Sequence, residues 1–354
     1  MPKIIVMSQF FENITIDNFK SVRHIELNDC KRINLFIGKP NVGKSNILEA
    51  LSLFSITHNS SIRTRFNNSF KSYIRYDSER ELFFNGLIEP SSAINIQSNL
   101  INCNLTFQPN EGIKMHIYGD GFDTTTTIEL DERVGVPLMK NSQPYARTFK
   151  KVKKYIFDLN RPGKNINIKN GSTLPFLMPP FGNNLMNIIS GNEELTKDTI
   201  EFFKRYELDV VFDEASNTIK LMKLRQGEND IMRIFLLPYS SMADTLQRVI
   251  FYKTAIASNK DSILLFEEPE AHAFPPYIVH VTQEMIWSKD NQFFLTTHSP
   301  FVLNDFLENA REDLAVYLVD WKKGETTVKR LSDADLDEIY QYGVDLFTNI
   351  ETFI

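Results

Sequence analysis

Residues 33–54 read INLFIGKPNVGKSNILEALSLF, and the pattern in this stretch decides the fold class of the chain. The apolar run 33–37 predicts a short buried strand, and the apolar residues spaced through 47–54 predict a helix. Residues 38–45 between them follow the spacing G-x-x-x-x-G-K-S. A strand, a glycine-rich loop and a helix in this order form the context in which this spacing indicates a phosphate-binding loop.

The residue types in this loop suit a triphosphate. Gly38 and Gly43 let the backbone turn tightly, so that amides can point at phosphate oxygens. The N-terminus of the following helix adds the positive end of its dipole. Lys44 is placed to reach the β- and γ-phosphates, and Ser45 to hold Mg²⁺. The sequence therefore predicts a nucleoside triphosphate with Mg²⁺ as the ligand.

A second strand ends in acids. Residues 263–272 read ILLFEEPEAH, in which an apolar run stops at two glutamates. Carboxylates at the end of a buried strand are costly unless something positive meets them. We assign Glu267 to the Mg²⁺ shell and Glu268 to the base that orients or deprotonates the attacking water.

A histidine follows a third strand. Residues 291–300 read NQFFLTTHSP, and His298 lies just beyond the apolar run 293–295. Its distance along the chain from Glu267 and Glu268 leaves room for one helix between neighbouring strands of a parallel sheet. We expect His298 to hydrogen-bond the γ-phosphate and to sense its loss.

These motifs together resemble the ABC-type ATPases of the SMC, RecF and OLD group. The matching text is NFKS at 18–21, GKPNVGKSNILEAL at 38–51, LLFEEPEAH at 264–272 and TTHSP at 296–300. The resemblance is closer still to the short bacterial AAA-family ATPases allied to OLD, many of which serve in anti-phage defence. In that family two heads enclose two ATP molecules, so the resemblance implies a homodimer or a higher assembly of dimers.

The resemblance also implies roles for individual residues. It makes Lys44, Glu268 and His298 catalytic, and Ser45 and Glu267 the residues that hold Mg²⁺. It makes the following residues the ATP-binding set: Lys20, Gly38, Lys39, Pro40, Asn41, Val42, Gly43, Lys44, Ser45, Asn46, Ser240 and Ser241. Lys20 belongs to the first-hairpin motif, whose basic residue lies near the ribose and phosphates of the nucleotide.

The signature segment departs from the family pattern. Family members usually show a serine followed by glycine, whereas Ser240 and Ser241 are followed here by no glycine. Their hydroxyls could still reach the nucleotide of a second head, and the segment could equally be the first turn of a core helix. Gln97 and Gln108 are both candidates for the glutamine that the family places near Mg²⁺.

The expected fold class is α/β: a P-loop NTPase of ABC-ATPase type, with a mixed central sheet, an antiparallel β-lobe and an inserted α/β lobe. We expect residues 1–131 to carry the phosphate-binding loop and the β-lobe, 132–235 to form the inserted lobe, and 236–354 to complete the head. No sustained heptad pattern predicts long coiled-coil arms.

Bulk properties favour a cytoplasmic protein. The 354 residues carry a net charge of -6 and only two cysteines, Cys30 and Cys103, far apart in the chain. This predicts a reducing compartment rather than a disulfide framework. We find no secretory signal and no apolar run long enough to cross a bilayer, and we expect no membrane partner.

Two basic stretches have open interpretations. Residues 60–80 interleave aromatic residues with Arg63, Arg65, Lys71 and Arg75. Residues 147–169 contain Arg147, Lys150, Lys151, Lys153, Lys154, Arg161, Lys164 and Lys169. The first stretch suits backbone and stacking contacts with a nucleic acid. The second suits a phosphate backbone or another acidic partner. The first suits an exposed helix equally well, and the second a solvated loop and strand edge.

The functional expectation is an ATPase that hydrolyses ATP and controls a separately encoded effector or a nucleic acid, in the setting of anti-phage defence. We find no strand-borne acidic pair typical of a Toprim nuclease, and residues 332–338, SDADLDE, predict the N-terminus of a helix. Two alternatives stay open: a DNA repair or recombination ATPase similar to RecF and SMC proteins, and an ATP-binding scaffold with little hydrolysis.

Overall fold

The computed structural model describes residues 9–55, 70–89, 92–108, 112–119, 122–128, 151–159, 174–226 and 232–353. The chain divides into two compact units. The first comprises residues 1–154, 261–268 and 289–354, and the second comprises residues 155–260 and 269–288. The expected boundary after residue 131 lies outside the described residues, and the division into three segments stays a prediction.

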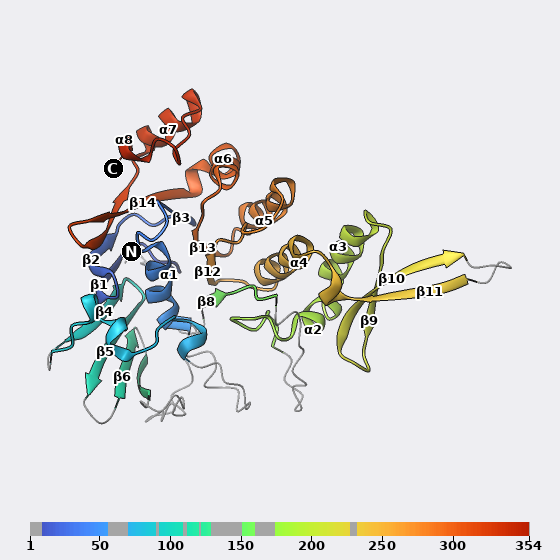
Figure 1. Cartoon of the computed structure of the whole chain (residues 1–354), viewed down its shortest axis with the longest axis horizontal. Helices are drawn as coiled ribbons and strands as arrows, with labels where there is room; N and C mark the ends of the chain where they lie inside the picture. Colours follow the sequence, from blue (N-terminus) through green and yellow to red (C-terminus); the bar gives the residue numbers. More distant parts are fainter. Residues whose placement is uncertain are drawn as a thin grey trace, which may run out of the picture. The chain divides into compact units, whose positions relative to one another are not determined.

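A mixed six-stranded sheet forms the centre of the first unit (Figure 1). Its order is β15-β14-β3-β13-β12-β8, with β14, β3, β13 and β12 parallel and β15 antiparallel to β14. The strands are β3 (Ile33–Ile37), β8 (Val152–Tyr155), β12 (Ile263–Glu267), β13 (Gln292–Thr296), β14 (Leu314–Lys322) and β15 (Glu325–Arg330).

The parallel arrangement brings three distant motifs to one edge of this sheet. Strands β3 and β13 are buried along their whole length, and β12 is buried up to its last residue, Glu267. Such continuous apolar runs are typical of parallel strands covered on both faces. Because parallel strands end at the same edge, the loops that follow β3, β12 and β13 lie side by side.

A six-stranded antiparallel sheet completes the framework of the first unit. Its order is β2-β1-β4-β5-β6-β7. The strands are β1 (Ile14–Phe19), β2 (Val22–Leu27), β4 (Ala93–Ser98), β5 (Ile101–Gln108), β6 (Gly112–Gly119) and β7 (Phe122–Ile128). The hairpin turn between β1 and β2 carries Lys20, which has a positive φ of 52°.

Helix α1 (Lys44–Ser52) lies between the two sheets (Figure 1). It contacts β12 and β13 of the mixed sheet and β1 of the antiparallel sheet. Ile47, Leu48 and Leu51 are fully buried in the shared core, which fits the apolar spacing of the sequence. The helix begins directly after the glycine-rich loop, so the packing of α1 also fixes the position of that loop.

Short helices close the C-terminal part of the first unit. They are α6 (Pro300–Asn309), α7 (Asp333–Tyr342) and α8 (Ile350–Phe353). Ser332 and Asp335 form a capping box at the start of α7, in which each side chain bonds the backbone amide of the other residue. The acidic stretch at 332–338 therefore begins a helix, as its pattern predicts.

The second unit combines helices with a small sheet. Its helices are α2 (Leu185–Ser190), α3 (Glu193–Lys204), α4 (Asp244–Ala257) and α5 (Pro275–Trp287). Strands β9 (Asp209–Asp213), β10 (Thr218–Gln226) and β11 (Met232–Pro238) form an antiparallel sheet in the order β11-β10-β9. The β10–β11 hairpin extends away from the helices of this unit (Figure 1) and exposes Ile234, Phe235 and Leu236.

No helix among the described residues is long and apolar enough to span a bilayer.

Candidate nucleotide-binding site

A cavity of about 770 Å³ opens in the first unit around the loop between β3 and α1. It is lined by Lys20, Ser21, Pro40, Asn41, Val42, Gly43, Lys44, Ser45, Asn46, Glu49, Arg75, Glu268, His298 and Trp321. The cavity thus brings together most of the expected ATP-binding set with both expected catalytic residues from the other strand ends. Its size is within the range of small-molecule sites.

Tight packing explains both glycines of the loop. A Cβ at Gly38 would lie 2.1 Å from the carbonyl oxygen of Val319 on β14. Gly43 has a φ of +100°, and a Cβ there would lie 2.1 Å from Oγ1 of Thr326 on β15. The Thr326 hydroxyl in turn donates a hydrogen bond to the carbonyl of Val42, at 2.9 Å. The β14–β15 hairpin therefore supports the loop from behind.

Lys44 folds back over the loop. Its ammonium donates to the carbonyl oxygens of Gly38, at 2.9 Å, and Lys39, at 2.7 Å. Burial lowers the pKa of Lys44 to about 8, and the nearby carboxylate of Glu268 opposes that shift. The ammonium is thus held inside the curl of the loop, where phosphate oxygens can replace the two carbonyls. The Lys39 side chain points elsewhere and pairs with Glu351, at 2.6 Å.

Ser45 and Glu267 lie next to each other. Burial raises the pKa of Glu267, but Lys154, Arg75 and a hydrogen bond from Ser45 together hold it below its ordinary value. Glu267 is therefore ionised at neutral pH. A hydroxyl and a carboxylate in contact fit Mg²⁺, which takes few protein ligands and keeps phosphate and water oxygens for the rest. Among the described residues no cluster of three or more His, Cys, Asp or Glu side chains offers another metal site.

Glu268 and His298 face each other at the cavity wall. Nε2 of His298 lies 3.4 Å from Oε1 of Glu268, and both side chains are partly exposed. Glu268 has a positive φ of 43°, and its amide donates to the carbonyl of Thr296, at 3.2 Å. Such a backbone conformation is costly for a non-glycine residue and is commonly found at functional sites. Burial and Lys44 lower the pKa of His298 against the opposing effect of Glu268, so the imidazole is neutral at neutral pH.

The first hairpin also lines the cavity. The Lys20 ammonium forms an ion pair with Glu49 of α1 and donates to the carbonyl of Arg75. Next to it, the side-chain amide of Asn46 donates to the Ser21 hydroxyl, at 2.6 Å. These contacts tie the hairpin turn to the first two turns of α1. They place a basic side chain and two polar ones beside the glycine-rich loop.

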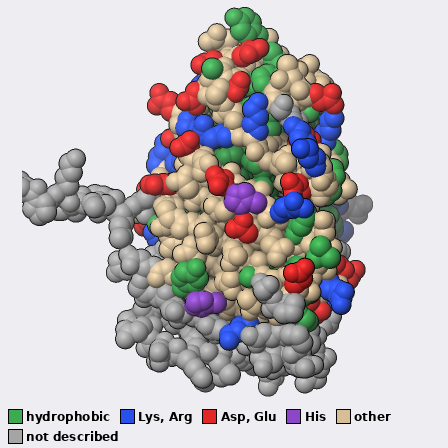
Figure 2. All heavy atoms as spheres, turned by 90° about the vertical axis from the view of Figure 1, so that its left-hand side faces the viewer, with side chains coloured by type: hydrophobic (Ala, Val, Ile, Leu, Met, Phe, Trp, Pro, Cys, Tyr) green, Lys and Arg blue, Asp and Glu red, His purple; other side chains and the backbone are tan. Residues whose placement is uncertain are grey.

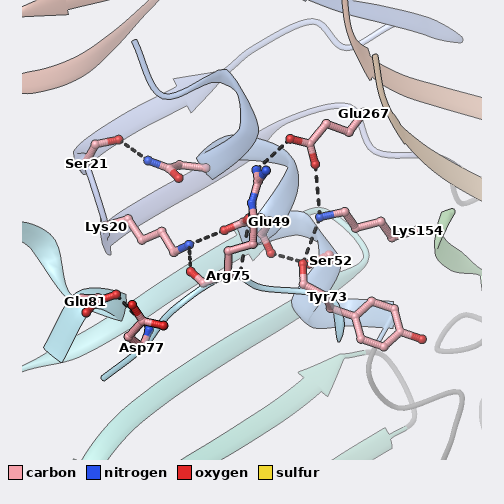
Figure 3. A network of polar contacts seen from close by, with 11 residues as sticks. Lys20, Ser21, Glu49, Ser52, Tyr73, Arg75, Asp77, Glu81, Lys154 and Glu267 are labelled. Carbon is pink, nitrogen blue, oxygen red and sulfur yellow. Dashed lines mark hydrogen bonds and ion pairs between the residues drawn. The ribbon is translucent and has the colours of Figure 1, made fainter. Parts of the chain in front are cut away.

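Sequence analysis missed a network of charges around Glu49 and Glu267 (Figure 3). Arg75 Nε donates to Glu49 at 2.8 Å, and Arg75 Nη2 donates to Glu267 at 2.7 Å. The Lys154 ammonium lies 3.8 Å from the other oxygen of Glu267 and donates to the carbonyl of Tyr73, at 2.9 Å. The acid assigned to Mg²⁺ is thus contacted by two basic side chains.

The interpretation of the second basic stretch needs correction. Lys153 and Lys154 are buried on β8, where we expected a solvated edge or a phosphate-binding surface. Lys153 donates to the Ser262 hydroxyl, at 2.9 Å, and Lys154 to Tyr73. The apolar neighbours Val152 and Tyr155 in the sequence were the signal for a buried strand. Arg147, Lys150, Arg161, Lys164 and Lys169 lie outside the described residues.

The first basic stretch is not an ordinary helix in its described part. Residues 70–72 form a single 3₁₀ turn, Tyr73 and Ile74 are buried, and Arg75 enters the site. Arg63 and Arg65 lie outside the described residues. The pattern of alternating basic and aromatic residues thus concealed a segment that packs its aromatic side on the core and directs one arginine at Glu267.

Ser240 and Ser241 are not in this cavity. They belong to the second unit, in a 3₁₀ turn (Tyr239–Ser241), and both are exposed. Helix α4 begins only at Asp244 and has Ala243 at its N-cap, so neither serine caps it. Gln97 is exposed on β4, and the side chain of Gln108 lies outside the described residues. The choice between the two glutamines stays open.

Comparison with solved structures shows the class of fold. A Smc head domain from Pyrococcus furiosus, solved with the C-terminal domain of ScpA, matches at a TM-score of 0.50 and 12% identity, over 93% of this chain and 98% of that one. The fold is therefore that of the SMC heads, the ABC-ATPase fold. Two further matches have TM-scores below 0.5 and do not contribute to this assignment. The Thermotoga maritima SMC head matches at a TM-score of 0.43 and 11% identity, over 91% of this chain and 99% of that one. An SmcHead bound to the C-winged helix domain of ScpA matches at a TM-score of 0.46 and 14% identity, over 91% of this chain and 98% of that one.

Sequence comparison adds one short match. The uncharacterised protein MJECL10 of Methanocaldococcus jannaschii is 49% identical over 43 residues, which is 12% of this chain and 20% of that protein. The chain thus matches about a fifth of the length of this relative. No protein-family model matches the chain.

Proposed function

We propose that this protein is an ABC-type ATPase that binds Mg-ATP in the cavity beside α1 and hydrolyses it. The observation that carries the proposal is the meeting of three distant segments in one cavity. Lys44 and Ser45 come from the loop after β3, Glu268 from the end of β12, and His298 from the end of β13. The first segment brings a cation and a hydroxyl for the phosphates and Mg²⁺, the second a carboxylate for the attacking water, and the third an imidazole for the γ-phosphate.

The proposed roles draw on the lining of the cavity and on the family resemblance. Lys44 binds the β- and γ-phosphates, and Ser45 and Glu267 are the residues that would hold Mg²⁺, which neutralises developing charge on the phosphates. Glu268 orients or deprotonates the attacking water. His298, held beside Glu268, hydrogen-bonds the γ-phosphate oxygens. Lys20, in the hairpin turn, lies near the phosphates and ribose, and Asn46 contacts the nucleotide from the first turn of α1.

We further propose that two copies close around ATP, with Ser240 and Ser241 of one copy contacting the nucleotide of the other. The proposal draws on the resemblance to the SMC, RecF and OLD group and on the SMC-head fold. Closure would act on a separately encoded effector protein. The setting that we propose for this effector is anti-phage defence. A protein partner has a precedent in the solved Pyrococcus furiosus Smc head, which is bound to the C-terminal domain of ScpA.

The face drawn in Figure 2 lacks the charge distribution expected of a surface that grips nucleic acid. On the face drawn in Figure 2, basic and acidic side chains are interspersed over the described surface. A protein that grips nucleic acid by its phosphates gathers basic side chains on one face.

The test is Glu268→Gln, assayed for ATP turnover and for solution mass with and without Mg-ATP. We expect the variant to lose turnover by about 100-fold or more and to show a larger ATP-dependent mass than the unmodified protein. If turnover survives the substitution, Glu268 is not the base. If the unmodified protein binds ATP without turnover or change of mass, the protein is an ATP-binding scaffold, and the glycine-free segment at Ser240–Ser241 is the place to look for the cause.

A further inference from the structure

The carboxylate assigned to the metal is already occupied by a side chain. Oε1 of Glu267 accepts a hydrogen bond from Nη2 of Arg75, at 2.7 Å. Its other oxygen lies 3.8 Å from the ammonium of Lys154, which is almost fully buried. Figure 3 shows the two cations reaching Glu267 from different directions. A carboxylate so neutralised is a poor ligand for a further cation, because like charges at this range disfavour each other.

Of the two cations, Arg75 is the one that can leave. Lys154 is buried and bonds the carbonyl of Tyr73, whereas the side chain of Arg75 is 66% exposed. Arg75 also has a second acid to retain it, because its Nε donates to Glu49 at 2.8 Å. Releasing Glu267 therefore breaks one hydrogen bond while the guanidinium keeps its other ion pair.

The backbone around Arg75 is fixed, so that the exchange is confined to the side chain. The carbonyl of Arg75 accepts from Lys20, and the carbonyl of Tyr73 accepts from Lys154 and from the Ser52 hydroxyl, at 3.3 Å. Glu49 is 1% exposed and is paired with both Lys20 and Arg75. The network thus positions the guanidinium between a permanent acid, Glu49, and a shared one, Glu267.

We propose that Arg75 is a positioning residue that pairs with Glu267 and competes with a divalent cation for it. Glu267 becomes available to Mg²⁺ only when Arg75 releases it, which the negative charge of the incoming triphosphate favours. The metal site is thereby kept closed until nucleotide arrives. The inference rests on the proposed function, since it takes Glu267 and Ser45 as the metal-binding residues.

The experiment measures Mn²⁺ binding to the nucleotide-free protein by electron paramagnetic resonance, with Mn²⁺ alone as the probe. Arg75→Gln removes the charge and both ion pairs, and we expect it to tighten Mn²⁺ binding about fivefold, the upper range for a partly exposed ion pair. A purely structural role for Arg75 would weaken Mn²⁺ binding instead. The gain should vanish when Glu267→Gln is added to Arg75→Gln.

Arg23→Gln is the matched control. Arg23 is 69% exposed, lies in the same unit and pairs with Glu325, at 3.1 Å, so the variant removes one similar charge away from Glu267. The proposal is overturned if Arg75→Gln leaves Mn²⁺ affinity unchanged or weaker. It is equally overturned if Arg23→Gln gives the same gain, or if the gain persists without Glu267. A failure of the unmodified protein to bind Mg-ATP would count against the proposed function, and the Mn²⁺ result does not depend on it.

Discussion

At the scale of single residues, the site depends on side chains that are held by neighbours far away in the sequence. The side chain of Thr326 leaves no room for a Cβ at position 43, so a glycine is needed there. The loop carbonyls hold the ammonium of Lys44 by hydrogen bonds. Arg75 and Lys154 contact the carboxylate of Glu267. Motif spacing identifies which residues carry the chemistry. It does not say which residues orient them, because those partners come from other strands and have no fixed distance along the chain.

Gly43→Ala is expected to abolish ATP binding and to destabilise the protein. A Cβ would lie 2.1 Å from Thr326 Oγ1, and φ at Gly43 is +100°. The backbone conformation alone costs roughly 1–2 kcal/mol for a residue with a side chain, and the clash adds to it. Urea unfolding and ATP titration measure the two effects.

Gly324→Ala is the control that separates the steric clash with Thr326 from the free-energy cost of a positive φ. Gly324 has a φ of +84°, and its added Cβ would meet no atom within 4 Å. We expect this control to lose stability without losing ATP affinity. Equal effects of the two substitutions on ATP binding would show that the contact between the loop and Thr326 is unimportant.

The fluorescence of Trp321 should change when nucleotide binds in the cavity. It lines the cavity, and the chain contains only one other tryptophan, Trp287, which is 67% exposed in the second unit. In Trp287→Phe, whose remaining indole is Trp321, we expect Mg-ATP to change the fluorescence with saturation. In Trp321→Phe the signal should not respond. A response carried by Trp287 alone would place the nucleotide elsewhere.

At the scale of elements, the strands β3, β12 and β13 do most to build the site. Their parallel register brings the ends of three sequence motifs together. The short edge strand β8 is a different case, because its two central lysines are buried. A strand with two lysines in its sequence can lie in the core when the lysines contact hydroxyl, carbonyl and carboxylate groups.

Lys153, one of the two buried lysines of β8, predicts a pH-dependent free energy of unfolding. Burial lowers the pKa of Lys153 to about 7, from 10.5. Between those values the unfolded chain binds a proton that the folded protein does not, so the free energy of unfolding rises with pH across this window, by up to about 1.4 kcal/mol per pH unit. Lys153→Met should remove this contribution. It should therefore be stabilising relative to the unmodified protein near pH 7, with the advantage shrinking toward pH 10.

Urea unfolding at several pH values gives the comparison. Because Lys154 and other groups titrate in both proteins, only the difference between the two curves is informative. Parallel curves would mean that Lys153 is not desolvated in the folded protein.

At the scale of the whole molecule, the expected ATP-binding set divides between the two compact units. The cavity belongs to the first unit, and Ser240 and Ser241 belong to the second. A nucleotide bound in the cavity stabilises the unit that holds it by mass action, whereas the second unit responds only if it also contacts nucleotide.

Hydrogen exchange with Glu268→Gln and Mg-ATP tests this division. Amides of α1 that exchange by unfolding of the site should slow by up to about 100-fold at a nucleotide concentration 100 times Kd. Amides at 240–242 should slow as well, but only at protein concentrations at which the dimer forms. Helix α3 serves as the internal reference. Protection of α1 without concentration-dependent protection at 240–242 would support a nucleotide-binding monomer and contradict the two-headed closure.

The sequence by itself determined the mixed α/β fold class and most of the lining of the cavity. Glycine spacing, a strand ending in acids and a histidine after a third strand are local patterns, and each follows from short-range physics. Only the tertiary structure revealed Thr326 behind the loop, the burial of Lys153 and Lys154, and the hold of Arg75 on Glu267. These are pairings between segments distant in the chain. The surroundings of a charged group decide whether its charge is favoured, as in Glu267, or disfavoured, as in Lys153, and a one-dimensional pattern carries no record of those surroundings.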